Sequence, residues 1–117
     1  QLTINGDGQQ TRDYIYVDDI CAAIEEVIWH DAQGVFQLGT GIGSSILDVA
    51  GEFRRINPAL QLTHAPSLSG EVRHNRADIS SAAATFGFTP RHLLSDGIRQ
   101  TLDWFESLFE NKRRISE

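Results

Sequence analysis

The segment that most restricts the possible folds of this chain is the run from Gly6 to Asp19. It starts within a cluster of turn-forming residues at 5–8, and such clusters separate elements of secondary structure. Residues 11–17 are then rich in β-branched and aromatic side chains, which favour an extended backbone. Asp18 and Asp19 follow at a place where the first turn of a helix favours carboxylates. The run therefore predicts a turn, an extended segment and a helix in direct succession.

The rest of the chain continues this alternation of strand and helix patterns. Leu2–Ile4 is a short β-type run, and apolar residues at helical spacing predict a helix from residue 17 to about His30. Beyond these we expect, in chain order, a strand at 35–38, a helix at 46–57, a strand at 60–64, an extended segment at 72–77, a short helix at 78–86 and a last helix from 95 onward. This order predicts a mixed α/β fold in which two helices cross over within a parallel sheet.

Sequence signals also indicate where these helices begin. Ser45 with Asp48 three residues later resembles a capping box, in which each residue satisfies a backbone N–H of the other. Asp78 is expected to cap the short helix, and Ser95 or Asp96 the last one. The last helix is expected to turn four apolar side chains toward the interior: Ile98, Leu102, Phe105 and Phe109.

Composition excludes several classes of protein. The 117 residues suit one small domain, and a net charge of −6 argues against a nucleic-acid-binding protein. No stretch approaches the roughly 20 apolar residues that cross a membrane. The single cysteine, Cys21, permits no intrachain disulfide, which fits a reducing, cytoplasmic compartment. Cys21 lies on the apolar stripe of the first helix, so we expect it in the core. The four histidines lie in separate elements and predict no metal site.

The segment from Gly6 to Asp19 resembles the extended short-chain dehydrogenase/reductase family of nucleotide-sugar epimerases and dehydratases. In that family, Gly-Asp-Gly is followed by Arg-Asp-aromatic and then by an acidic helix start. Three later segments are similar to the family pattern in the same order: Val35-Phe36-Gln37-Leu38-Gly39-Thr40-Gly41, then Gly70-Glu71-Val72-Arg73 with Phe86-Gly87-Phe88-Thr89-Pro90, and the closing helix from Gly97 to Phe105. Four ordered matches over nearly the whole chain are far more specific than any single one.

The resemblance implies that residues 1–117 are the C-terminal, substrate-binding part of a Rossmann-type enzyme, and that an N-terminal dinucleotide-binding domain precedes Gln1. In the family, that domain binds NAD or NADP and supplies a catalytic Tyr-x-x-x-Lys pair. This chain has one lysine, Lys112, and no such pair. We therefore expect the piece to bind no cofactor and to catalyse nothing alone. The loop Gly39-x-Gly41-x-Gly43 lacks the spacing of a dinucleotide fingerprint and is expected to be a tight turn.

Three residues are the candidate substrate contacts. Arg12 lies at the mouth of the extended segment, where its planar guanidinium suits a phosphate pair and the neighbouring Asp13 is expected to hold it in position. The resemblance implies that Arg12 binds the nucleotide diphosphate, that Glu71 contacts the nucleoside and that Gln37 contacts the ligand.

The chain departs from the family pattern at Leu68, where a second phosphate-binding arginine is usual. Either Arg73 or Arg76 replaces that arginine from nearby, or the ligand binds more weakly, or the parent uses a different activated substrate. Losing one bidentate, charge-assisted pair weakens binding by roughly 1.5–3 kcal/mol.

Two functions remain open from the sequence. The chain is the nucleotide-sugar recognition lobe of an NAD(P)-dependent epimerase (or of a dehydratase or reductase of the same family), or it is a degenerate, non-catalytic binding module. In the first case its partners are a nucleotide-diphosphate sugar and its own N-terminal domain. The piece alone is expected to self-associate, and the parent to form a homodimer.

Overall fold

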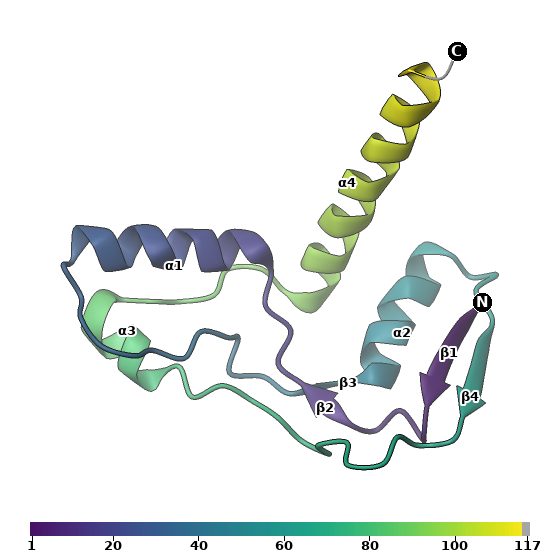
Figure 1. Ribbon diagram of the computed structural model, residues 1–117, viewed down its shortest axis with the longest axis horizontal. Helices are drawn as coiled ribbons and strands as arrows, with labels where there is room; N and C mark the ends of the chain where they lie inside the picture. Colours follow the sequence, from purple (N-terminus) through teal and green to yellow (C-terminus); the bar gives the residue numbers. More distant parts are fainter. Residues whose placement is uncertain (116–117) are drawn as a thin grey trace.

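In the computed structural model, the described residues form four short strands and four helices (Figure 1). The backbone is described for residues 1–115 and the side chains for residues 1–109. The elements are β1 (Leu2–Asn5), β2 (Thr11–Arg12), α1 (Val17–Trp29), β3 (Ser44–Ser45), α2 (Ile46–Ile56), β4 (Leu62–Ala65), α3 (Ser80–Phe86) and α4 (Leu94–Ile115). The mixed α/β class expected from the sequence is confirmed. Lys112 belongs to α4, but its side chain lies outside the described part.

The expected parallel pairing occurs between β1 and β4, which lie side by side next to α2 in Figure 1. Leu2 is paired with Leu62 at one end of this ladder and Asn5 with Ala65 at the other. A second, antiparallel pair joins β2 to β3, and a single parallel bridge joins Thr11 to His74. Thr11 of β2 therefore has a neighbouring segment on each side.

The helix starts agree with the sequence in one case of three. The capping box of α2 is confirmed, because Ser45 Oγ accepts from Asp48 N at 3.0 Å and Ser45 N donates to Asp48 Oδ2 at 2.8 Å. The expected cap of α3 is wrong, because Ile79 and not Asp78 occupies the N-cap position; Asp78 lies one residue earlier, where its Oδ1 accepts from Ser80 N at 3.0 Å. The expected cap of α4 is wrong, because the helix already begins at Leu94 and its first turn closes on the carbonyl of Leu93.

The expected strand at residues 35–38 is also wrong, and this segment is irregular. A strand needs a neighbouring backbone to pair with, and none lies beside 35–38 among the described residues. Its side chains are ordered by packing instead, since the ring of Phe36 meets that of Phe86 edge-on at 5.1 Å. Within the extended segments expected at 11–17 and 72–77, only Thr11, Arg12 and His74 form β-type pairs with a neighbouring segment.

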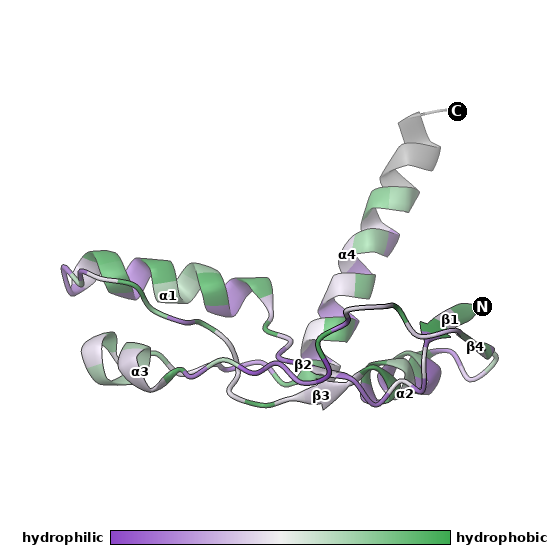
Figure 2. Ribbon diagram, turned by 60° about the horizontal axis from the view of Figure 1, so that its bottom comes forward, coloured by the Kyte–Doolittle hydropathy of each residue, from purple (hydrophilic) through white to green (hydrophobic). Residues whose placement is uncertain are grey.

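Ile4 on β1 and Ala50 on α2 are buried, but the main cluster of buried residues is small and lies between α1 and α3. It contains Ala23, Ala82, Phe86 and Phe88, with six partly buried neighbours: Ile15, Val27, Ala32, Phe36, Leu38 and Ile79. The radius of gyration is 17.4 Å, whereas a compact domain of this length has about 13 Å. The structure is therefore open, with α4 projecting away from the other elements (Figures 1 and 2).

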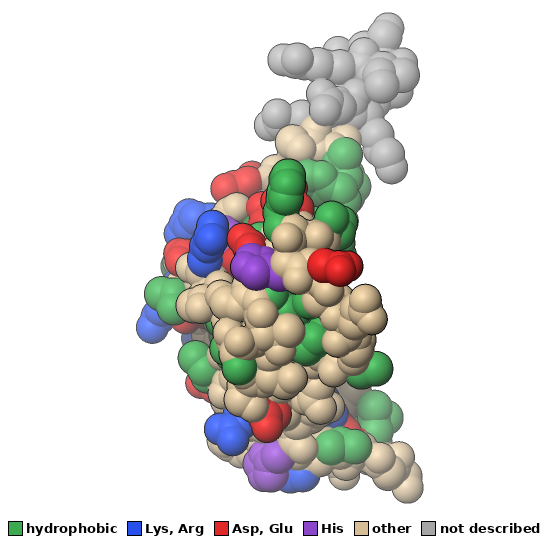
Figure 3. All heavy atoms as spheres, turned by 90° about the vertical axis from the view of Figure 1, so that its left-hand side faces the viewer, with side chains coloured by type: hydrophobic (Ala, Val, Ile, Leu, Met, Phe, Trp, Pro, Cys, Tyr) green, Lys and Arg blue, Asp and Glu red, His purple; other side chains and the backbone are tan. Residues whose placement is uncertain are grey.

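The open arrangement leaves much apolar surface exposed. Cys21 is exposed, so its expected place in the core is wrong. On α1, Val17, Ile24, Ile28 and Trp29 are all more than half exposed, and Figure 2 shows the resulting hydrophobic colouring along the helix. The expected inward turn of two α4 side chains is wrong too: Phe105 is 46% and Phe109 62% exposed. Hydrophobic side chains gather at the surface just before the grey end of the molecule in Figure 3.

Candidate ligand-binding site

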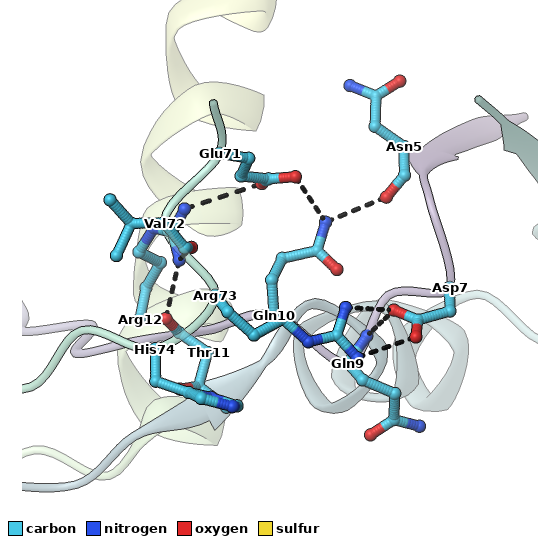
Figure 4. Close-up of polar contacts among 10 residues, drawn as sticks. All are labelled: Asn5, Asp7, Gln9, Gln10, Thr11, Arg12, Glu71, Val72, Arg73 and His74. Atoms are coloured by element: carbon cyan, nitrogen blue, oxygen red, sulfur yellow. Dashed lines mark hydrogen bonds and ion pairs between the residues drawn. The ribbon is translucent and has the colours of Figure 1, made fainter. Parts of the chain in front are cut away.

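Arg12 ends β2 and points across the neighbouring segment 71–73 (Figure 4). Its Nη1 donates to the carbonyl of Thr11 at 2.8 Å and to that of Val72 at 2.7 Å. Its Nη2 lies 3.5 Å from Oε1 of Glu71. A guanidinium has five N–H donors. These contacts use both hydrogens of Nη1 and turn Nη2 toward Glu71, which leaves donors for an anionic ligand.

The expected role of Asp13 in holding Arg12 is wrong, because the Asp13 carboxylate turns away toward two other loops. Its Oδ1 accepts from the backbone N–H and the hydroxyl of Thr40, and its Oδ2 accepts from Gly41 N at 2.9 Å and Ala77 N at 3.2 Å. Partial burial alone raises the pKa of Asp13, but the hydrogen bonds from Thr40, Ala77 and Gly41 outweigh it and lower the pKa below 3.8. Asp13 thus joins three segments of the chain beside Arg12.

The glycine-rich loop at 39–43 donates hydrogen bonds to the Asp13 carboxylate, and its geometry does not fit a dinucleotide. A Cβ placed on Gly39 would lie 2.6 Å from Asp13 Oδ2, so only glycine allows the close approach. The N–H groups of Thr40 and Gly41 donate to Asp13, whereas a phosphate-binding loop presents such groups to its ligand. The interpretation of 39–43 as a tight turn is consistent with this geometry, and we assign no NAD contact to it.

Glu71 lies next to Arg12, although 59 positions separate them in the sequence. Backbone hydrogen bonds explain the proximity, because Thr11 N donates to the carbonyl of Arg73 at 2.9 Å and Asn75 N donates to that of Thr11 at 3.2 Å. These bonds fasten the segment around residue 73 along β2. The carboxylate of Glu71 then meets Arg12 on one side and Gln10 on the other, with 3.5 Å between Gln10 Nε2 and Glu71 Oε2 (Figure 4).

Gln37 shares a cavity with Arg12. The cavity has a volume of about 300 Å³ and is lined by Arg12, Asp13, Gln37, Leu38, Asn75 and Ala77. Gln37 Oε1 accepts from Asp78 N at 2.9 Å, which leaves its N–H₂ group as the donor available toward the cavity. The structure therefore brings all three sequence-predicted contacts to one place: Arg12 and Gln37 line the cavity, and Glu71 flanks Arg12.

Neither arginine considered as a replacement at position 68 lines this cavity. Arg73 forms a bidentate pair with Asp7, at 2.8 Å and 2.7 Å, and this pair lowers the pKa of Asp7 to about 2, chiefly through the hydrogen bonds from Arg73. Figure 4 shows Arg73 turned toward Asp7, away from Arg12. Arg76 is exposed, and so is Leu68. Arg12 is the single arginine of this cavity within the described side chains.

Sequence reasoning missed two buried polar residues, Gln10 beside the site and Asp19 on α1. Gln10 is 4% exposed and contacts Glu71, and the only sequence signal for it was its place two residues before Arg12. Asp19 was expected only to favour the first helical turn, yet it is buried and accepts from the backbone of Arg91 and from both the backbone and ring of His92. Burial alone raises the pKa of Asp19, but the hydrogen bonds from His92 and Arg91 outweigh it and lower the pKa.

The described part of the chain contains neither a candidate metal site nor a candidate membrane-spanning helix. No group of three or more His, Cys, Asp and Glu side chains is placed to hold a metal ion. Among the described helices, none combines the length and the apolar character that a membrane span requires.

Comparison with known proteins agrees with this fold. Residues 1–39 match the NAD dependent epimerase/dehydratase family. The chain is 32% identical over 113 residues to a dTDP-L-rhamnose 4-epimerase of Burkholderia thailandensis, covering 91% of this chain and 30% of the relative. It is 33% identical over 109 residues to a UDP-glucose 4-epimerase of Mycolicibacterium smegmatis, covering 89% of this chain and 34% of the relative.

Solved structures give the same result. A UDP-glucose 4-epimerase from Thermotoga maritima with UDP-glucose superposes with a TM-score of 0.84 at 28% identity, over 93% of this chain and 36% of that one. A UDP-glucuronic acid 4-epimerase from Bacillus cereus, in complex with UDP-glucuronic acid and NAD, gives a TM-score of 0.76 at 31% identity, over 91% of this chain and 35% of that one. The chain therefore belongs to the NAD-dependent epimerase/dehydratase family, of the extended short-chain dehydrogenase/reductase type. It spans about a third of the length of these relatives.

Proposed function

We propose that this chain is the nucleotide-sugar recognition lobe of an NAD-dependent epimerase. Arg12 binds the diphosphate, Glu71 contacts the nucleoside and Gln37 contacts the ligand from the far side of the cavity. The observation that best supports the proposal is the convergence of Arg12, Glu71 and Gln37, which come from three distant segments of the sequence.

The chemistry of the three side chains suits a nucleotide sugar. The free N–H donors of Arg12 match the oxygens of a diphosphate, with the geometry that makes charge-assisted pairs strong. A carboxylate such as that of Glu71 accepts from the hydroxyl groups of a ribose, and the amide N–H₂ of Gln37 donates to an oxygen of the ligand. The cavity of about 300 Å³ contains one arginine, Arg12, whereas the chain as a whole has a net charge of −6. An anion would therefore be recognised by this side chain and not by the overall charge of the chain.

In this proposal the lobe acts by orientation. Binding the unreactive nucleotide fixes the sugar relative to the reacting groups, and this remote binding energy lowers the barrier of the chemical step. NAD would accept and return a hydride in an N-terminal dinucleotide-binding domain that precedes this lobe in the parent. The lobe alone is inactive, because it has no Tyr-x-x-x-Lys pair.

A second candidate function follows from Leu68. If one arginine is too few for a sugar nucleotide to be held for catalysis, the parent is a degenerate member that binds nucleotides or proteins without turnover. A dehydratase or reductase of the same family is the remaining alternative, and relatives of this chain include a dTDP-glucose 4,6-dehydratase of Streptomyces niveus, 27% identical over 108 residues.

The test is calorimetric titration of the 117-residue chain with UDP-glucose and dTDP-glucose. Arg12→Ala should weaken binding of the preferred ligand about 10- to 150-fold, because it removes a charge-assisted pair worth about 1.5–3 kcal/mol. Arg54→Ala is the matched control, since Arg54 is an exposed arginine on α2 outside the cavity. Equal affinity of Arg12→Ala and the unmodified chain would show that the diphosphate assignment is wrong.

A further inference from the structure

Gln10 is a buried amide whose two N–H donors both have acceptors. It is 4% exposed, and its Nε2 donates to the carbonyl of Asn5 at 2.8 Å and faces Glu71 Oε2 at 3.5 Å. Its backbone carbonyl accepts from Ile46 N at 3.2 Å. Gln10 is therefore fixed between the end of β1 and the start of α2, with its amide directed at segment 71–73 (Figure 4).

The orientation of this amide leaves a buried atom without a partner. Oε1 of Gln10 is buried and accepts no hydrogen bond from the described residues. Exchanging the amide oxygen and nitrogen would place Oε1 against the Asn5 carbonyl and the Glu71 carboxylate, so three oxygens would meet without a hydrogen. The observed orientation is thus the one that directs both donors at Asn5 and Glu71, and its consequence is an unsatisfied acceptor.

Glu71 depends on such donors for its position. Residues 70–76 form an exposed segment, yet the Glu71 side chain is only 25% exposed. Its Oε1 faces Arg12 and its Oε2 faces Gln10, each at 3.5 Å. Of these two donors, Arg12 is the one that an incoming diphosphate would draw away, because an anion competes with a carboxylate for the same guanidinium. Gln10 is neutral and anchored on Asn5, so it remains in place.

We propose that Gln10 is a positioning residue of the nucleotide site: its amide keeps the Glu71 carboxylate directed at the nucleoside when Arg12 turns to the diphosphate. This rests on the proposed function, and it gives the two ends of the nucleotide separate supports. Arg12 serves the phosphate end, while Gln10 acts through Glu71 on the nucleoside end.

The test measures binding of UDP and of inorganic pyrophosphate to the 117-residue chain. Gln10→Met keeps the length of the side chain and removes both donors. It should weaken UDP binding about five- to tenfold and change pyrophosphate binding less than about twofold, because pyrophosphate has no nucleoside. Glu71→Gln should show the same selectivity for UDP. The double variant should be no weaker than Glu71→Gln alone, because the two residues act as one unit.

Two results would overturn the proposal: Gln10→Met weakens UDP and pyrophosphate equally, as a merely structural role requires, or the losses from Gln10→Met and Glu71→Gln simply add. The side-chain amide signal of Gln10 in a ¹⁵N-labelled unmodified chain supplies an independent test if Gln10→Met does not fold. That signal should shift more with UDP than with pyrophosphate, and no shift with UDP contradicts the proposal.

The same experiment separates this proposal from the proposed function. UDP binding that depends on Arg12 but not on Gln10 rejects only the role of Gln10. If the unmodified chain binds neither UDP nor pyrophosphate, the proposed function is wrong and the role of Gln10 fails with it.

Discussion

The polar junction around β2 (residues 10–13, 37–41 and 71–77) and the outer face of α1 differ in how many contacts their side chains make with the rest of the chain. At the junction, the Asp13 carboxylate receives four hydrogen bonds, and Arg12 contacts two carbonyls and a carboxylate. On α1, Ile28 is 72% and Trp29 83% exposed. The carboxylates of the junction have partners within the described chain, while these side chains of α1 are exposed to solvent.

This difference indicates which region determines the structure of the chain itself. Directional contacts between distant segments fix the junction to one geometry, and each unmade bond there leaves a charged or polar group without a partner. The face of α1 gains little from folding, because its side chains remain in water. Substitutions should therefore affect the two regions through different properties: the free energy of unfolding at the junction, and association at the apolar face.

The largest effect on stability is expected for Asp13→Asn. The amide keeps one accepting oxygen and places an NH₂ group against two of the N–H donors that now serve the carboxylate, so two charge-assisted bonds are lost. The free energy of unfolding should fall by about 2–4 kcal/mol, measured by urea denaturation followed by circular dichroism. Asp18→Asn is the control, because Asp18 is exposed in the first turn of α1, and it should cost less than about 0.5 kcal/mol. Equal effects of the two variants would contradict the role assigned to Asp13.

A smaller effect, dependent on pH, is expected for Asp19→Asn. The folded-state pKa of Asp19 lies below its ordinary value of 3.8, so its ionised form stabilises the fold at every pH above that value. This contribution is lost as the pH falls through the folded-state pKa, because the protonated carboxyl no longer accepts from His92 and Arg91. The difference in free energy of unfolding between the unmodified chain and Asp19→Asn should be constant near neutral pH and shrink below about pH 4. A difference that stays constant into strong acid would contradict it.

The smallest effect on stability is expected at the apolar face. Ile28→Gln combined with Trp29→Gln should change the free energy of unfolding by less than about 0.5 kcal/mol, because both side chains are exposed. The same change should weaken the self-association that we propose for the isolated chain, since exposed apolar patches drive association. Analytical ultracentrifugation measures this, with Glu25→Gln as the control on an exposed polar position of α1. Unchanged association would show that another surface is responsible.

Local signals in the sequence predicted the elements whose determinants are themselves local. The capping box at Ser45 and Asp48 and the apolar periodicity of α1 both depend on residues within one or two turns. The strand expected at 35–38 and the burial expected of Cys21 and Phe105 depended on what lies opposite them. The hydrophobic pattern of a segment indicates its preferred backbone conformation and which of its faces favours burial. It does not reveal which other segment pairs with it or packs on that face.

The candidate site was predictable only in part, for the same reason. Arg12, Glu71 and Gln37 were found by their resemblance to a family pattern, and the structure brings them together. The carboxylate next to Arg12 was assigned to Asp13 because the two are adjacent in sequence, but along an extended backbone adjacent side chains point to opposite sides. Glu71 takes that place from 59 positions away, and no spacing rule in the sequence encodes such a contact.

The contacts of Asp13 also have a consequence for how the chain folds. Its hydrogen bonds span 27 positions to Thr40, 28 to Gly41 and 64 to Ala77. Closing loops of that length costs conformational entropy before any bond is gained, and contacts of high sequence separation slow folding. The helices can form early from local interactions, whereas the cavity with Arg12 and Gln37 exists only after three separate parts of the chain have met. A ligand that binds this cavity would thus select molecules that have completed the last steps of folding.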